Sequence, residues 1–129
     1  MPNTDFARPE AGDFSIRVRN QGAVLLIQLA GPLSGASVDI VRMYVNSALV
    51  THSPPKIVLD VEALTCCDQA GCGIMRSAAD RARTLGGRLI ITGGSHVLPD
   101  DPDDLDRLPT ISRALHELGR SRTHEHGDT

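Results

Sequence analysis

The feature that most constrains the fold is the alternation of short apolar runs with segments of helical periodicity along the middle of the chain. Two runs rich in β-branched residues and leucine, 57–61 and 89–91, each follow a stretch in which apolar residues recur every three or four positions, 36–51 and 71–85. Such runs are typical of central strands in a parallel sheet, and the stretches between them are typical of helices that cover it. With an earlier strand at 23–29, they form two β-α-β units, which predict right-handed crossovers.

A β-hairpin is expected to open the sheet. Residues 14–19 alternate apolar and polar side chains, which is the period of a half-buried strand, and residues 20–22 form an Asn-Gln-Gly turn signal. The segment 23–29 then pairs with the first strand and gives the sheet an antiparallel edge. We expect Gly31-Pro32 to end this second strand.

The C-terminal part is expected to contain a loop and one more helix. Residues 99–104 form an acidic, proline-broken loop, and the apolar spacing over 110–118 predicts a helix that ends at Gly119. The element order is therefore β-β-α-β-α-β-loop-α. This order predicts an α/β domain with a mixed, mainly parallel sheet flanked by helices.

The chain has 129 residues, a length that suits one domain. We assign the domain to residues 13–119, after a flexible lead-in of 1–12 and before a polar tail of 120–129. Aromatic residues make up only 2%, so the core must be built from Val, Ile, Leu and Ala.

The helical periodicity also predicts which residues face the sheet. The inner face of the first helix is Val38, Val41, Val45, Ala48 and Leu49. The inner face of the second helix is Ile74, Met75, Ala78, Ala82 and Leu85. We expect Ala78 and Ala82 to lie beneath the strand residues Ile57, Leu59 and Ile90.

Composition argues against several classes of function. With 13 Lys and Arg against 16 Asp and Glu, the formal charge is −3, and with so few aromatic rings direct nucleic-acid binding is not expected. The longest apolar run, 23–27, is far short of the roughly 20 residues that span a membrane. The N-terminus shows no signal-peptide pattern, so we place the protein in the cytoplasm. Three cysteines at Cys66, Cys67 and Cys72 do not form a secreted disulfide framework.

Patterns that could support catalysis or metal binding are incomplete. Gly71-Cys72-Gly73 lacks the third glycine of a dinucleotide-binding loop, and the aspartates between 100 and 106 lack the spacing of a calcium loop. His124-Glu125-His126 has no third metal ligand at a sensible distance. A nucleophilic Cys72 at a helix N-terminus is chemically possible, but no base accompanies it in the sequence. We therefore expect no enzyme, no metal and no cofactor.

The most informative segment is the turn between the strand at 57–61 and the helix that follows. Asp68 lies where its carboxylate can cap the free N–H groups of that helix. Ala70 and Gly71 are small, so the turn could offer a flat surface to a partner. The alternative is a plain helix cap, with small residues there only for tight packing.

Three segments together resemble the STAS family of anti-sigma factor antagonists. The first is Leu29-Ala30-Gly31-Pro32-Leu33, similar to the family's strand followed by G-x-L-D. The second runs from Ile57 to Gly73, similar to V-L-D-L-S-x-V-x-x-x-D-S-S-G-L-G. The third is the second helix followed by Gly86-Gly87-Arg88-Leu89-Ile90-Ile91, similar to A-x-x-x-G-G-x-L-x-L-V. The resemblance covers about residues 14–93.

The resemblance implies that the turn binds a partner that is both anti-sigma factor and kinase, which phosphorylates the serine before the glycine. That position is Ala70 in this chain, and the neighbouring serine is Gln69. Ser34 stands at the family's aspartate. Thr65 retains a hydroxyl upstream, on the strand side, where we expect a kinase not to reach it.

The first functional reading is an anti-sigma factor antagonist that releases a sigma factor and lacks the phosphoacceptor. Its partner-binding residues would be Ser34, Asp68, Gln69, Ala70, Gly71 and Cys72. Cys66, Cys67 and Cys72 could supply a redox switch instead, with Cys67 and Cys72 as the better pair because they bracket the turn. The alternative is a non-switching scaffold subunit of a stress-signalling or lipid-transport complex. A homodimer is compatible with either reading.

Overall fold

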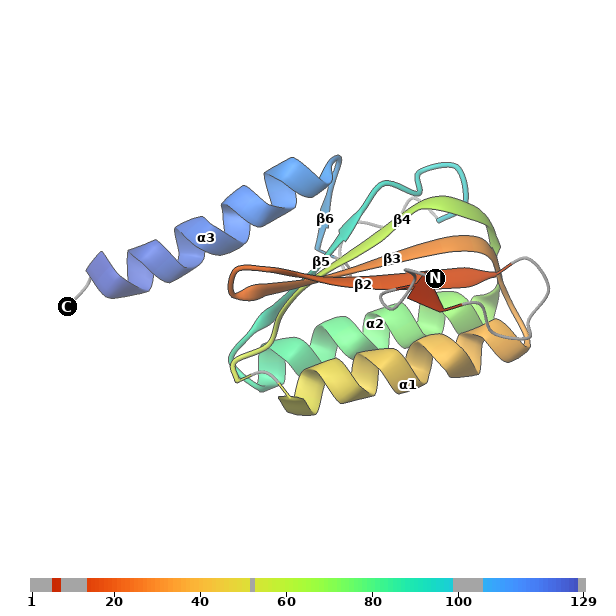
Figure 1. Cartoon of the computed structure of the whole chain (residues 1–129), viewed down its shortest axis with the longest axis horizontal. Helices are drawn as coiled ribbons and strands as arrows, with labels where there is room; N and C mark the ends of the chain where they lie inside the picture. The colour runs from red at the N-terminus through yellow and green to blue at the C-terminus, as the bar shows by residue number, and fades with distance from the viewer. Residues whose placement is uncertain (1–5, 8–13, 52, 99–105, 128–129) are drawn as a thin grey trace.

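The computed structural model describes residues 6–7, 14–51, 53–98 and 106–127, and shows the expected mixed α/β fold (Figure 1). Its strands are β1 Phe6–Ala7, β2 Ser15–Gln21, β3 Val24–Leu33, β4 Lys56–Cys67, β5 Arg88–Thr92 and β6 Arg107–Leu108. Its helices are α1 Ala36–Thr51, α2 Gln69–Thr84 and α3 Ile111–Gly127. The six strands form one sheet in sequence order, antiparallel from β1 to β3 and parallel from β3 to β6.

Helices α1 and α2 lie side by side under one face of the sheet, and α3 lies over the other (Figure 1). Because successive strand residues point to opposite faces, each central strand serves both layers. Ile57 and Leu59 of β4 belong to the cluster under α1 and α2, whereas Val58 packs with Ala114 and Leu118 of α3. All five residues predicted for the inner face of α1 are buried.

The same alternation corrects the predicted position of Ile90. Ala78 and Ala82 pack with Ile57 and Leu59, but Ile90 belongs to the cluster on the α3 face. Its neighbours Leu89 and Ile91 point toward α1 and α2, so Ile90 must point away from them. Leu85 was also wrongly assigned to the inner face of α2. It is the C-cap residue and is 49% exposed.

Strands β3 and β4 run beyond their predicted ends. Gly31-Pro32 does not end β3, which continues to Leu33, and β4 continues from the predicted 57–61 to Cys67. The two strands stay paired through a register shift between Gly31 and Pro32. An irregularity of this kind is where a sheet tolerates proline, since the missing N–H then interrupts no regular ladder.

Three features at the ends of the chain were not predicted. The two-residue strands β1 and β6 are too short to show a period, and β1 lies within the expected lead-in. Helix α3 does not end at Gly119 but continues to Gly127, into the expected polar tail. A glycine inside a helix costs only about 1 kcal/mol, so other residues can outweigh it. The rest of the lead-in and the acidic loop 99–104 lie outside the described residues.

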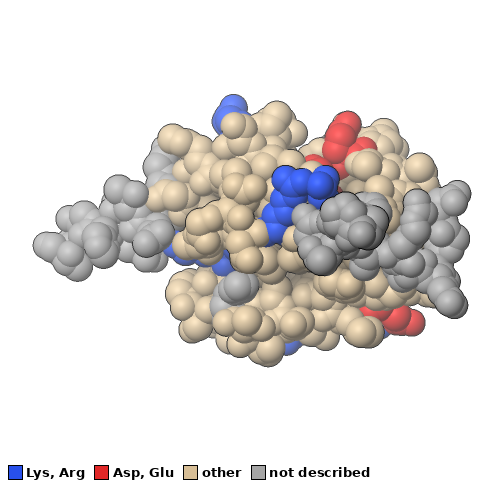
Figure 2. Space-filling model, viewed as in Figure 1, with Lys and Arg blue, Asp and Glu red and all other residues tan. Residues whose placement is uncertain are grey.

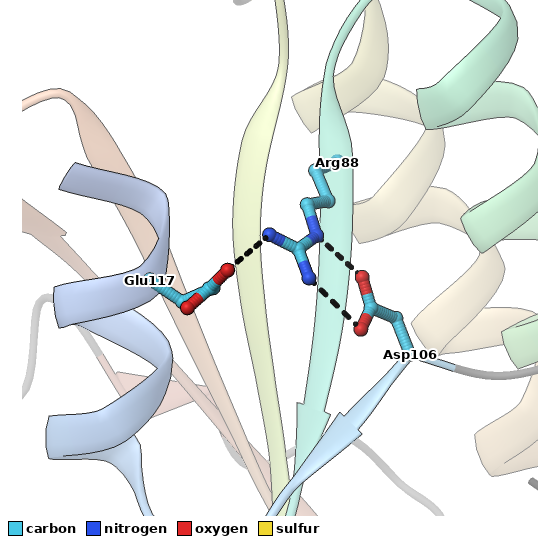
Figure 3. A network of polar contacts seen from close by, with 3 residues as sticks. All are labelled: Arg88, Asp106 and Glu117. Carbon is cyan, nitrogen blue, oxygen red and sulfur yellow. Dashed lines mark hydrogen bonds and ion pairs between the residues drawn. The ribbon is translucent and has the colours of Figure 1, made fainter. Parts of the chain in front are cut away.

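A polar network joins α3 and β6 to the sheet (Figure 3). Arg88 at the start of β5 donates two hydrogen bonds to the carboxylate of Asp106, one of them 3.1 Å long, and a third of 3.4 Å to Glu117 of α3. The hydrogen bonds that Arg88 donates to Asp106 raise the pKa of the Arg88 guanidinium, which keeps it charged. The network is structural, because it holds three elements together away from the turn before α2.

Candidate functional site

The candidate site is built on the turn between β4 and α2. Asp68 is the N-cap of α2, and its Oδ1 accepts a 2.8 Å hydrogen bond from the backbone N–H of Gly71. The N–H of Asp68 donates to the carbonyl of Leu33 at 3.1 Å, which ties the turn to the end of β3. The predicted cap is therefore confirmed. The side chains of Asp68, Gln69 and Ala70 are all exposed.

Gly71 faces inward rather than toward a partner. It is buried, and a Cβ at this position would lie 3.0 Å from the side-chain atoms of Leu33 and from Sγ of Cys67. At this residue the structure favours the tight-packing interpretation of the small side chain. The outward surface of the turn is formed by Asp68, Gln69 and Ala70.

Ser34 is brought to the same edge of the sheet. It directly follows Leu33, which pairs with Cys67 and accepts the hydrogen bond from Asp68. Ser34 is half-buried, and its N–H donates to Oγ of Ser37 at 2.8 Å. Ser34 and the turn therefore lie together where β3 and β4 end, as expected for the carboxyl ends of neighbouring parallel strands.

Two of the three cysteines are in contact. The Sγ atoms of Cys67 at the end of β4 and Cys72 in the first turn of α2 lie 3.6 Å apart, and both residues are half-buried free thiols. Cys66 is exposed and is not part of this contact. Burial, together with the Cys72 contact and the charge of Asp68, raises the pKa of the Cys67 thiol to about 12. Cys67 is therefore a protonated thiol at neutral pH.

The structure also shows two features that the sequence did not reveal. Thr65 lies on β4, as expected, but its side chain is exposed; whether a kinase can reach it stays a prediction. An open groove with a volume of about 320 Å³ runs between α1 and α2 and begins at Ala70. Its walls come from helices far apart in the sequence, so no local pattern could have indicated it.

Within the described residues, no three His, Cys, Asp or Glu side chains are grouped as a metal site would require. None of the described helices is long and apolar enough to cross a membrane. On the face shown in Figure 2, charged side chains are few and of both signs, and most of the visible surface carries no charge. That face therefore offers no broad basic surface of the kind that follows a nucleic-acid backbone.

Comparison with known structures supports the fold. The chain is similar to an anti-sigma factor antagonist from Mycobacterium paratuberculosis, with 13% identity, coverage of 81% of this chain and 93% of that one, and a TM-score of 0.72. It is similar to the Bacillus antagonist SpoIIAA in its unphosphorylated form, with 17% identity, coverage of 81% and 97%, and a TM-score of 0.65. RsbS from Moorella thermoacetica gives 15% identity, coverage of 84% and 97%, and a TM-score of 0.66.

Sequence comparison gives the family. A search of curated protein sequences finds no significant match. The sequence profile of the STAS domain, however, matches residues 15–100, which include the sheet from β2 to β5, both crossover helices and the capped turn. The chain therefore belongs to the STAS-domain family.

Proposed function

We propose that this protein is an anti-sigma factor antagonist whose turn before α2 stays permanently competent to bind a kinase-type anti-sigma factor. The observation that carries the proposal is the exposed Ala70 beside the capping Asp68, at the position where the family resemblance implies a phosphorylated serine. The similar solved structures named above include anti-sigma factor antagonists, one of them SpoIIAA, known in unphosphorylated and phosphorylated forms.

Because residue 70 is alanine, phosphorylation cannot change the charge of the turn at this position. Phosphorylation would add about −1.5 to −2 charges to an exposed turn and so oppose a partner that binds the uncharged form. Ala70 has no hydroxyl, and the carboxamide of Gln69 is not a phosphoacceptor. Binding would therefore release the sigma factor for as long as the antagonist is present, without a phosphate-dependent off state.

The test is a phosphorylation and binding assay with the purified anti-sigma factor from the same genome. We expect no phosphate on the wild-type turn and no effect of ATP on affinity. Ala70→Ser should restore phosphorylation and make binding ATP-sensitive, which is a gain that misfolding cannot imitate. Thr65→Ala serves as the control for the other exposed hydroxyl. ATP-dependent loss of wild-type binding would contradict the proposal. A pull-down from the native cytosol that recovers only self-assemblies or a transporter would favour the scaffold role.

We also propose that the Cys67–Cys72 pair can regulate the turn by thiol–disulfide exchange. The Sγ atoms lie 3.6 Å apart, so a movement of less than about 2 Å would bring them to the 2.05 Å of a disulfide bond. Because the Cys67 thiol has a pKa of about 12, Cys72 is the group that attacks first. Its thiolate displaces one thiol from a low-molecular-weight disulfide. Cys67 then attacks the mixed disulfide, loses its proton and releases the second thiol.

The redox proposal is tested by measuring partner affinity in a reductant and after treatment with oxidised glutathione. Oxidation closes a ring around residues 68–71, so we expect a different affinity that returns on reduction. Cys72→Ser should abolish the difference, whereas Cys66→Ser should leave it unchanged, because Cys66 is exposed and not in contact with the pair. Equal affinity of the reduced and oxidised wild-type protein would overturn this proposal.

A further inference from the structure

The groove between α1 and α2 extends beyond the turn, and the proposed function does not use it. It holds about 320 Å³. The wall from α1 is formed by Arg42, Val45 and Asn46. The wall from α2 is formed by Ala70, Gly73, Ile74, Ser77, Ala78 and Arg81.

The charge of the groove is opposite to that of the whole protein. Its walls carry two guanidinium groups, Arg42 and Arg81, and no carboxylate, on a chain whose formal charge is −3. Arg81 of α2 donates to the carboxamide of Asn46 on α1, which holds this guanidinium across the groove. Arg42 pairs with the exposed Asp39, an ion pair of the kind that contributes about 0–1 kcal/mol and is readily exchanged. An acidic ligand would therefore meet two available positive charges.

The wall that α2 contributes to the groove is accessible. The side chains of Ala70 and Ser77 are small and exposed, and Gly73 between them has no side chain. A Cβ placed on Gly73 would meet no atom within 4 Å. A partner's side chains can therefore approach the backbone of α2 over two turns without displacing any group of this protein.

We propose that an acidic segment of the protein that binds the turn continues into this groove and pairs with Arg42 and Arg81. Ala70 belongs to both the turn and the groove wall, so a partner seated on the turn reaches the groove without a gap. The inference rests on the proposed function and extends the interface from one turn to the length of α2. A protein segment fits better than a small molecule, because the groove shares Ala70 with the exposed turn that the partner binds.

A pair of glycine variants tests the occupancy of the groove. Gly73→Leu adds a side chain to the α2 wall of the groove and replaces glycine with a strong helix former, so we expect a higher melting temperature and at least tenfold weaker binding of the purified anti-sigma factor. Gly119→Leu is the matched control. A Cβ there also meets no atom within 4 Å, and Gly119 lies in α3 on the other face of the sheet, so the melting temperature should rise without a change in affinity.

A pair of arginine variants tests the charge of the occupant. Arg81→Glu should weaken binding at least tenfold at low salt and flatten the loss of affinity as salt rises, because one attraction to carboxylates is replaced by repulsion. Arg83→Glu makes the same charge change two residues away, at an exposed arginine that pairs with Asp80 and lies outside the groove. It should change affinity less than threefold.

The binding of these variants distinguishes an occupied groove from the proposed function on which this inference rests. If Ala70→Glu abolishes binding while Gly73→Leu and Arg81→Glu bind like the wild type, the proposed function stands and the groove is empty in the complex. If the wild-type protein does not bind the anti-sigma factor, both proposals fail. If Gly73→Leu instead changes the sedimentation of the free protein, the groove joins two copies of this chain, and the acidic partner segment is overturned.

Discussion

Two crossovers, from β3 to α1 and from β4 to α2, lead from adjacent parallel strands into helices on the same face of the sheet. In the first, the hydroxyl of Ser37 forms hydrogen bonds within the same turn. It lies 2.8 Å from the carbonyl of Pro32 and 2.9 Å from that of Ser34, accepts from the N–H of Ser34, and is only 1% exposed. The polar groups of this turn are therefore satisfied internally.

The second crossover leaves more of its side chains exposed. Asp68 uses one carboxylate oxygen to cap α2, and the side chains of Gln69 and Ala70 are exposed. Two thiols lie in contact just beneath them. Two turns in equivalent positions thus differ in their freedom to bind. The internally bonded turn contributes to stability, and the exposed turn is the one that a partner can use.

The largest effect should come from placing a carboxylate at each crossover. Ala70→Glu would put an unpaired charge in a desolvated interface, at a cost of about 2–5 kcal/mol, or roughly 30-fold to several thousand-fold in affinity. Ala36→Glu is the matched change at the first residue of α1, also exposed, and should bind like the wild type. Both should fold, because a negative charge is favourable at a helix N-terminus. Titration calorimetry with the anti-sigma factor measures both affinities.

Equal weakening by the two glutamates would mean that both crossovers contact the partner. In that case the internal bonding of the first turn would not decide which turn binds. Unchanged affinity for Ala70→Glu would remove the turn before α2 from the interface and leave the scaffold role as the better explanation.

When stability is measured instead of binding, the substitution at the first crossover should have the larger effect. Ser37→Ala removes the bonds of a buried hydroxyl and leaves the N–H of Ser34 without this acceptor, at a cost of about 1–3 kcal/mol. Asp68→Ala removes one exposed cap, at about 0.5–2 kcal/mol. Urea unfolding measures both free energies, and Asp68→Asn should retain most of the wild-type stability because its side-chain oxygen can still cap the helix. A larger loss for Asp68→Ala than for Ser37→Ala would contradict the contrast between the two turns.

Local patterns were sufficient to predict α1, α2 and the cap, but not the end of α3. The inner face of α1 followed from spacing alone, and Asp68 was identified because an N-cap is decided by residues within one turn of each other. The extension of β4 was different. Thr65, Cys66 and Cys67 show no strand alternation. They are extended because Cys66 and Cys67 pair with Pro32 and Leu33 of β3, with Thr65 at the register shift before them. That pairing depends on residues more than thirty positions away, which no local signal encodes.

Several features of the site could not be predicted because they depend on residues far apart in the chain. Cys67 and Cys72 bracket the turn in the sequence, but their 3.6 Å contact depends on how the first turn of α2 packs on β4. The inward position of Gly71 depends on Leu33, which comes from another strand. The groove depends on α1 and α2 lying side by side, with Asn46 and Arg81 joined across it. Each feature is set by tertiary packing rather than by spacing along the chain.

The last expected effect is a pH dependence confined to the second crossover, which is absent near neutral pH and develops only above pH 9. The Cys67 thiol ionises near pH 9.0 in the unfolded chain, but burial, mainly, raises its pKa to about 12 in the folded protein. The folded state thus retains a proton that the unfolded state releases. The contribution of Cys67 to the free energy of unfolding should be complete below pH 9 and decline as the pH rises toward 12.

With reductant present, the stability difference between the wild type and Cys67→Ala should narrow between pH 9 and pH 12. Ile74→Val, an apolar change packed against the same cluster, should give a difference that does not vary with pH. A Cys67→Ala difference that stays as constant as that of Ile74→Val would show that the thiol is not desolvated, and the argument that Cys72 attacks first would fail with it.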